Sequence, residues 1–97
     1  MTERIQISPK EADEKRCEFS VEVGHDTGEI GFWVKVDKEY WKELTGGRYP
    51  IEDLVQKTFE FLLYKEPKTA ILREFDLREL KEQFPDYEEE MKKKFWI

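Results

Sequence analysis

Asparagine is absent from this 97-residue chain, and cysteine and histidine each occur once. The single Cys17 cannot form a disulfide within the chain, which fits a reducing cytoplasm. One cysteine and one histidine also cannot supply the four ligands of a structural zinc site, and the carboxylates do not have calcium-loop spacing. We therefore expect no metal and no cofactor.

Long apolar runs are also missing. No stretch is long enough to cross a bilayer, and the opening Met1-Thr2-Glu3-Arg4 lacks the apolar region of a secretory signal. With 17 basic and 23 acidic residues, the chain has a net charge of −6. Each half contributes half of this charge, so phosphate backbones and anionic lipid heads are repelled. The sequence predicts a cytoplasmic protein that does not bind membranes, and its acidity disfavours nucleic acid as a partner.

Charged residues are abundant, at 41 % of the chain. With no asparagine, this composition is typical of proteins from very hot environments, where charge networks stabilise and labile amides are avoided. A highly charged mesophilic protein is the alternative. Aromatic residues reach 14 %, which is ample for one core in a single domain spanning residues 1–97.

The first third of the chain has the alternation of β-strands. Apolar residues occupy every second position in residues 16–24 and again in residues 29–37, separated by the turn His25-Asp26-Thr27-Gly28. A turn centred on Asp26-Thr27 places Val23 opposite Ile30. Each of the remaining apolar residues of the two strands then also lies opposite an apolar partner. A short strand over residues 4–7, followed by a polar connection over residues 8–14, completes a predicted three-stranded antiparallel meander.

The remainder reads as helices whose ends are marked by particular residues. Asp37 caps a helix over residues 38–45 that Gly46-Gly47 ends, and Pro50 starts a long central helix that ends at Glu66-Pro67. Its apolar stripe is widened by Phe61, Leu63 and Tyr64, which predicts burial on more than one side.

Two shorter helices follow a helical turn at residues 70–72. Asp76 and Glu79 form a capping box, and Asp86 with Glu89 repeats the pattern. The sequence thus predicts an α+β fold in which a meander over residues 1–37 packs against a helical cover over residues 38–97, consisting of the long central helix and two or three short ones.

Candidate chemistry is sparse. Asp26-Thr27-Gly28 is the tripeptide of aspartic proteases, but those enzymes are almost wholly β, and a hairpin turn explains the same residues. Cys17 and His25 would lie about 26 Å apart along one strand, too far to form a dyad. Thr45-Gly46-Gly47-Arg48 lacks the lysine and spacing of a phosphate-binding loop and reads as a helix–helix turn. We assign no catalytic residue.

Aromatic and arginine side chains without an evident structural role are the candidates for interaction, because these types dominate protein interfaces. The basic, aromatic tail Lys92-Lys93-Lys94-Phe95-Trp96-Ile97 is either a helix end that docks on the protein or a binding segment. The helices either cover both faces of the sheet or leave Trp33 free on an outer face. The candidate interaction residues are Trp33, Tyr40, Trp41, Arg48, Tyr49, Arg73, Phe95 and Trp96.

Residues 44–88 resemble a group of small prokaryotic proteins with no assigned activity. The similarity lies in the motifs Leu-Thr-Gly-Gly at residues 44–47, Phe-Glu-Phe-Leu-Leu-x-x-Glu-Pro at 59–67, Phe-Asp-Leu at 75–77 and Phe-Pro-x-Tyr-Glu at 84–88. It covers about half of the chain and implies a shared fold. The lysine-rich tail lies outside the pattern.

Three functions follow from these features. The first is a small, non-enzymatic cytoplasmic protein that binds other proteins, either as a homodimer or as the partner of a neighbouring gene product. The second is a small-molecule-binding protein or minor enzyme with a pocket between sheet and central helix, using Arg48, Tyr49, Glu66 or Arg73. The third is nucleic-acid binding through the tail, with affinity that falls steeply with salt.

Overall fold

The computed structural model describes residues 3–24 and 28–96. The strands in this part of the chain are β1 (Ile5–Ala12), β2 (Arg16–Val23), β3 (Ile30–Asp37) and β4 (Glu74–Asp76). The helices are α1 (Lys38–Thr45), α2 (Ile51–Lys65), α3 (Leu80–Gln83) and α4 (Tyr87–Phe95), with 3-10 turns η1 (Lys68–Ala70) and η2 (Leu77–Glu79). The α+β class is confirmed.

The strands form one mixed sheet in the order β1-β2-β3-β4, of which the first three are an antiparallel meander. The predicted hairpin register is confirmed, since Val23 pairs with Ile30 and Cys17 with Val36. On the opposite face, Glu18 pairs with Lys35, an opposite-charge pair that supports this register. The proposed turn at His25, Asp26 and Thr27 lies outside the described residues.

The prediction of three strands was wrong, because β4 adds a fourth. It runs parallel to β3, with Phe75 paired with Val34, and the Trp33 N–H donates to the Arg73 carbonyl at 2.7 Å. Three residues are too short to show an alternation, so Phe75 carried no strand signal of its own. The long connection through α1 and α2 supplies the crossover that a parallel pair needs.

Strand β1 is longer than predicted. It continues past Ile7 to Ala12, with a register irregularity between Pro9 and Ala12. The predicted strand ended at Ile7 because the polar residues 8–14 are typical of a connection between strands. On an edge strand the missing N–H of Pro9 is harmless when it faces away from the neighbour, and β1 is an edge strand.

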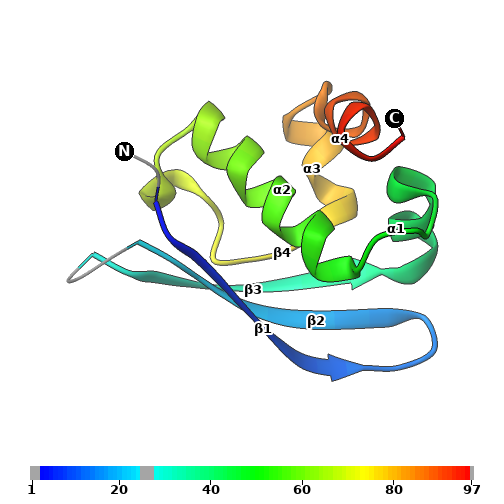
Figure 1. Ribbon diagram of the computed structural model, residues 1–97. Helices are drawn as coiled ribbons and strands as arrows, with labels where there is room; N and C mark the ends of the chain where they lie inside the picture. The colour runs from blue at the N-terminus through cyan, green and yellow to red at the C-terminus, as the bar shows by residue number, and fades with distance from the viewer. Residues whose placement is uncertain (1–2, 25–27, 97) are drawn as a thin grey trace.

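All the described helices lie on one face of the sheet (Figure 1). Helix α2 crosses that face and buries Leu54, Val55, Thr58, Phe59, Phe61 and Leu62. The alternative in which helices cover both faces is therefore wrong. Phe61 does reach a second side, where its ring meets Phe84 and Tyr87, but Tyr64 is 88 % exposed and does not widen the buried stripe.

Most predicted helix ends are confirmed. The Asp37 carboxylate accepts from the Glu39 and Tyr40 N–H groups, and both bonds of the Asp76–Glu79 capping box are present. Asp86 does not cap α4. Its carboxylate instead pairs with Lys65 at 2.9 Å, and this ammonium lowers the pKa of Asp86. The ion pair links α2 to the start of α4.

Because the Tyr87 phenol is buried, we expect the free energy of unfolding to fall at high pH. Burial raises the pKa of this fully buried phenol above the ordinary value of about 10. The folded state keeps the proton while the unfolded state loses it, so the contribution is intact below about pH 10 and falls as the pH rises toward the folded-state pKa. Each pH unit in that window costs about 1.4 kcal/mol. Urea unfolding at a series of alkaline pH values should show a shallower decline for Tyr87→Phe, whereas equal declines would contradict the prediction.

Candidate interaction site

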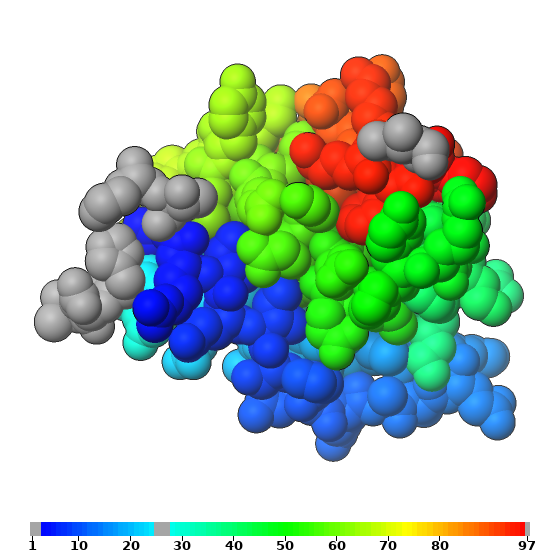
Figure 2. Space-filling model, viewed as in Figure 1, coloured from blue at the N-terminus to red at the C-terminus, as the bar shows by residue number. Residues whose placement is uncertain are grey.

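Four of the predicted interaction residues meet at one corner of the molecule. Helix α1 packs beside α4, and the α1–α2 connection lies against the C-terminal end of the described chain (Figure 1). In Figure 2 the red C-terminal segment lies directly against the green residues of α1 and α2. We call the set Trp41, Arg48, Tyr49 and Trp96 the aromatic corner.

Two glycines shape the connection. Gly46 and Gly47 have φ values of +74° and +73°, a left-handed conformation that other residues adopt at a cost. A Cβ atom built on Gly46 would also lie 3.1 Å from the Trp96 ring. Glycine at position 46 therefore both ends α1 and allows the indole to lie against the backbone.

Hydrogen bonds fix both indoles of the corner. Trp41 Nε1 donates to the Tyr49 carbonyl at 2.9 Å, and Trp96 Nε1 donates to the Glu43 carbonyl at 3.1 Å. The first bond ties α1 to the residue before Pro50, and the second ties the end of α4 to α1. Each indole is thereby oriented with its apolar ring partly free.

Ring contacts complete the corner. The Tyr49 ring tilts against Phe95 with centroids 5.2 Å apart, and the Arg48 guanidinium carbon lies 5.5 Å from the centroid of the Trp96 ring. Such a cation–π contact adds about 0.5–1 kcal/mol at an exposed site. Tyr49 remains 39 % and Trp96 51 % exposed, and Arg48 is exposed as well.

Tyr40 and Phe95 are core residues, so the prediction that they are available for interaction was wrong. Tyr40 is buried, and its hydroxyl donates to a Glu88 carboxylate oxygen at 2.7 Å. Phe95 is buried beneath Tyr49 at the end of α4. Both support the corner from within, because Tyr40 links α1 to α4 and Phe95 lies under the Tyr49 ring.

Trp33 and Arg73 lie elsewhere. Trp33 is half-buried on the uncovered face of the sheet, where Nε1 donates to Glu18 on the neighbouring strand at 2.6 Å. Arg73 precedes β4 and is exposed, near Trp33 through its main chain. The Glu18 carboxylate on β2 therefore accepts the indole hydrogen bond of Trp33 within the sheet, and neither Trp33 nor Arg73 belongs to the aromatic corner.

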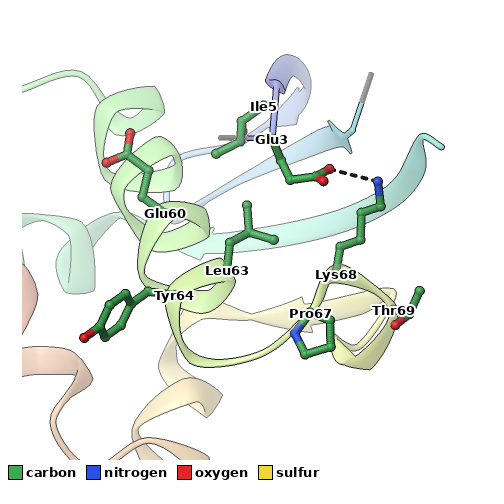
Figure 3. A pocket seen from close by; sticks show the side chains of 8 residues that line it. All are labelled: Glu3, Ile5, Glu60, Leu63, Tyr64, Pro67, Lys68 and Thr69. Carbon is green, nitrogen blue, oxygen red and sulfur yellow. Dashed lines mark hydrogen bonds and ion pairs between the residues drawn. The ribbon is translucent and has the colours of Figure 1, made fainter. Parts of the chain in front are cut away.

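A groove of about 640 Å³ opens between β1 and the C-terminal half of α2. Leu63 points toward Ile5 across it, and at one end Lys68 pairs with Glu3 at 2.8 Å (Figure 3). The residues predicted for a pocket between sheet and central helix, Arg48, Tyr49, Glu66 and Arg73, do not line this groove. Its lining residues are Glu3, Ile5, Glu60, Leu63, Tyr64, Pro67, Lys68 and Thr69.

Little in the described residues points to catalysis. Cys17 is half-buried, and burial raises the pKa of its thiol, the opposite of what a nucleophile needs. His25 and Asp26, the other residues weighed for chemistry, lie outside the described part. Among the residues described, no three His, Cys, Asp or Glu side chains gather around a possible metal position. In residues 3–24 and 28–96, no helix is both long and apolar enough to cross a membrane.

Comparisons of the chain with models of protein families, with curated proteins and with solved structures found no match. The resemblance of residues 44–88 to the small prokaryotic group therefore stays a prediction.

Gly46 gives a direct test of how the corner is built. Gly46→Ala should lower the free energy of unfolding by about 1–2 kcal/mol, because the left-handed backbone conformation is unfavourable for alanine. The added methyl group would also lie too close to the Trp96 ring. Gly31→Ala is the matched control, since a Cβ atom there meets nothing within 4 Å. Urea denaturation of both variants measures the effect, and an equal, small change in the two would contradict this account of the turn.

Proposed function

We propose that this protein is a small, non-enzymatic interaction protein that binds another protein through the aromatic corner. The observation that supports this is the joining of Arg48, Tyr49 and Trp96, from two distant parts of the chain, into one partly exposed surface. Arginine, tyrosine and tryptophan are the residue types that carry most of the binding energy in protein interfaces.

Preorganisation supports the proposal further. Each indole of the corner is hydrogen-bonded to a main-chain carbonyl, and the Tyr49 ring rests on the buried Phe95. Ordering a free side chain on binding costs about 0.5–1.5 kcal/mol, and side chains that are already held avoid part of that cost. A surface of this kind is suited to association without rearrangement.

The test is a comparison of proteins captured from the source cells by the tagged wild type and by an Arg48→Ala, Tyr49→Ala variant. Loss of a hot-spot contribution of about 2 kcal/mol corresponds to a roughly 30-fold loss of affinity, so the specific partner should disappear from the variant. Leu72→Ala is the control, because Leu72 is 65 % exposed and lies outside the corner.

Two further measurements complete this test. Circular dichroism should show that the double variant is folded, since both side chains are partly exposed. If all partners bind the double variant and the wild type equally, the corner is not the binding surface.

A further inference from the structure

Strand β1 presents a free edge. It is first in the strand order, and the Gly24 N–H donates to the Arg4 carbonyl at 2.9 Å. Main-chain N–H and C=O groups alternate in direction along a strand. Those of the even-numbered residues Arg4, Gln6 and Ser8 therefore point toward β2. The N–H and C=O groups of Ile5 and Ile7 consequently point outward, away from the sheet.

This edge is only partly protected. Proteins usually block exposed edges with proline, charges or bulges, because free main-chain groups recruit other strands. Here Pro9, Lys10 and the irregularity before Ala12 protect the second half of β1. The first half, around Ile5 and Ile7, has no such protection within the described residues, and both side chains are half-buried rather than covered.

The groove lies directly beside the unprotected half. Ile5 and Leu63 form its apolar floor between β1 and α2, and the Glu3–Lys68 ion pair closes one end (Figure 3). A strand added to β1 would direct every second side chain to the helix-covered side of the sheet. Those side chains would enter the groove, so apolar residues at alternate positions are the occupants that fit.

We propose that a second copy of this chain occupies the edge, with β1 pairing antiparallel to the partner's β1 about a two-fold axis at Gln6. In this register Ile5 lies opposite the partner's Ile7, and the two form a hydrogen-bonded pair in both symmetric positions. All the outward N–H and C=O groups of Ile5 and Ile7 are then satisfied. The two sheets join into one, with isoleucines from both copies over the grooves.

The neighbouring symmetric register, centred on Ile7, fits less well. It places Arg4 opposite the partner's Lys10 and Glu3 opposite the partner's Glu11, and like charges directly opposite are destabilising. It also leaves the Ile5 carbonyl facing Pro9, which has no N–H. Charge therefore selects the register centred on Gln6, in which Arg4 faces the partner's Ser8, and in this register Pro9 does not lie opposite Ile5.

This dimer rests on the proposed function only in that the chain acts by association, because β1 and the aromatic corner are separate surfaces. Light scattering across a concentration series should show a dimer of the full chain. The register is tested by cysteine cross-linking in a Cys17→Ser background, with oxidation in air. Gln6 is on the axis as a non-hydrogen-bonded pair, whose Cβ atoms are about 4.5–5.5 Å apart, so Gln6→Cys should form a disulfide dimer after a small adjustment.

Ser8→Cys is the matched control. In the proposed register two copies of position 8 are offset by four residues, about 13 Å, which is beyond disulfide reach. A dimer with cross-linking at position 6 and not at position 8 supports the inference. A monomer at all concentrations, a dimer without the position-6 cross-link, or cross-linking at position 8 instead would overturn it. A monomer that still loses its partner with the Arg48→Ala, Tyr49→Ala change would leave the proposed function standing.

Discussion

Replacement of Phe59 by alanine should lower the free energy of unfolding by about 3–5 kcal/mol, the usual cost of removing a large buried aromatic side chain. Phe59 is fully buried at the centre of the core. Its ring lies 5.3 Å from Phe32 on β3 and 5.9 Å from Phe75 on β4, measured between centroids. Truncation would remove the contacts that hold α2 to both strands of the parallel pair.

Small domains have total stabilities of about 5–15 kcal/mol, so this loss is a large fraction of the total. Urea denaturation followed by circular dichroism measures the loss. Tyr64→Ala on the same helix is the control and should change stability by less than about 0.5 kcal/mol, because Tyr64 is 88 % exposed. A loss below about 1 kcal/mol for Phe59→Ala would mean that α2 does not pack as described.

The second large effect concerns the buried hydroxyl pair. Thr58 and Tyr87 are both fully buried, and their hydroxyl oxygens lie 2.8 Å apart in a hydrogen bond between α2 and α4. Thr58→Val keeps the shape but leaves the Tyr87 hydroxyl without this partner. Leaving a buried polar group without a hydrogen-bond partner costs about 1–3 kcal/mol, which is the expected loss of stability.

A double-mutant cycle separates this effect from packing. Tyr87→Phe removes the hydroxyl that Thr58→Val leaves without a partner. The Thr58→Val, Tyr87→Phe variant should therefore recover much of the stability lost in Thr58→Val. Unfolding free energies of the four proteins give the coupling. Additive losses, with no recovery in the double variant, would show that the two hydroxyls do not interact.

Local sequence signals predicted much of the fold. The pairing of Val23 with Ile30 followed from alternation alone, because a slip by one residue would have turned a whole apolar set into water. The ends of α1 followed from Asp37 and Gly46, whose capping roles depend only on neighbouring residues. The capping box of Asp76 and Glu79 is local in the same sense.

Features that depend on distant partners were not predictable in this way. Strand β4 exists because its main chain reaches β3, and three residues around Phe75 carry no periodic signal. Asp86 had a cap-like spacing to Glu89, but Lys65 from another helix binds its carboxylate. Residues 8–12 were predicted to be a polar connection and not part of β1, because the sequence does not show that this strand lies at the edge, where a proline and polar side chains are tolerated.

For the candidate site too, the sequence predicted individual residues but not their arrangement in space. The sequence indicated Trp41, Arg48, Tyr49 and Trp96 as aromatic and arginine residues without a structural role, but it gave no sign that they meet. Their assembly depends on the contact between α1 and α4, across about half of the chain. The lining residues of the groove beside β1 were missed because they depend on how α2 crosses the sheet, although Ile5 and Leu63 were each recognised as apolar positions.

Photo-cross-linking in the source cells tests the central claim most directly. A photoreactive phenylalanine analogue at Tyr49 keeps an aromatic ring in the corner, and the same analogue at Leu72 is the control on an exposed position outside it. We predict a defined protein adduct from position 49 that is absent from position 72. No adduct from position 49, or the same adducts from both positions, would contradict the assignment of the aromatic corner as the binding surface.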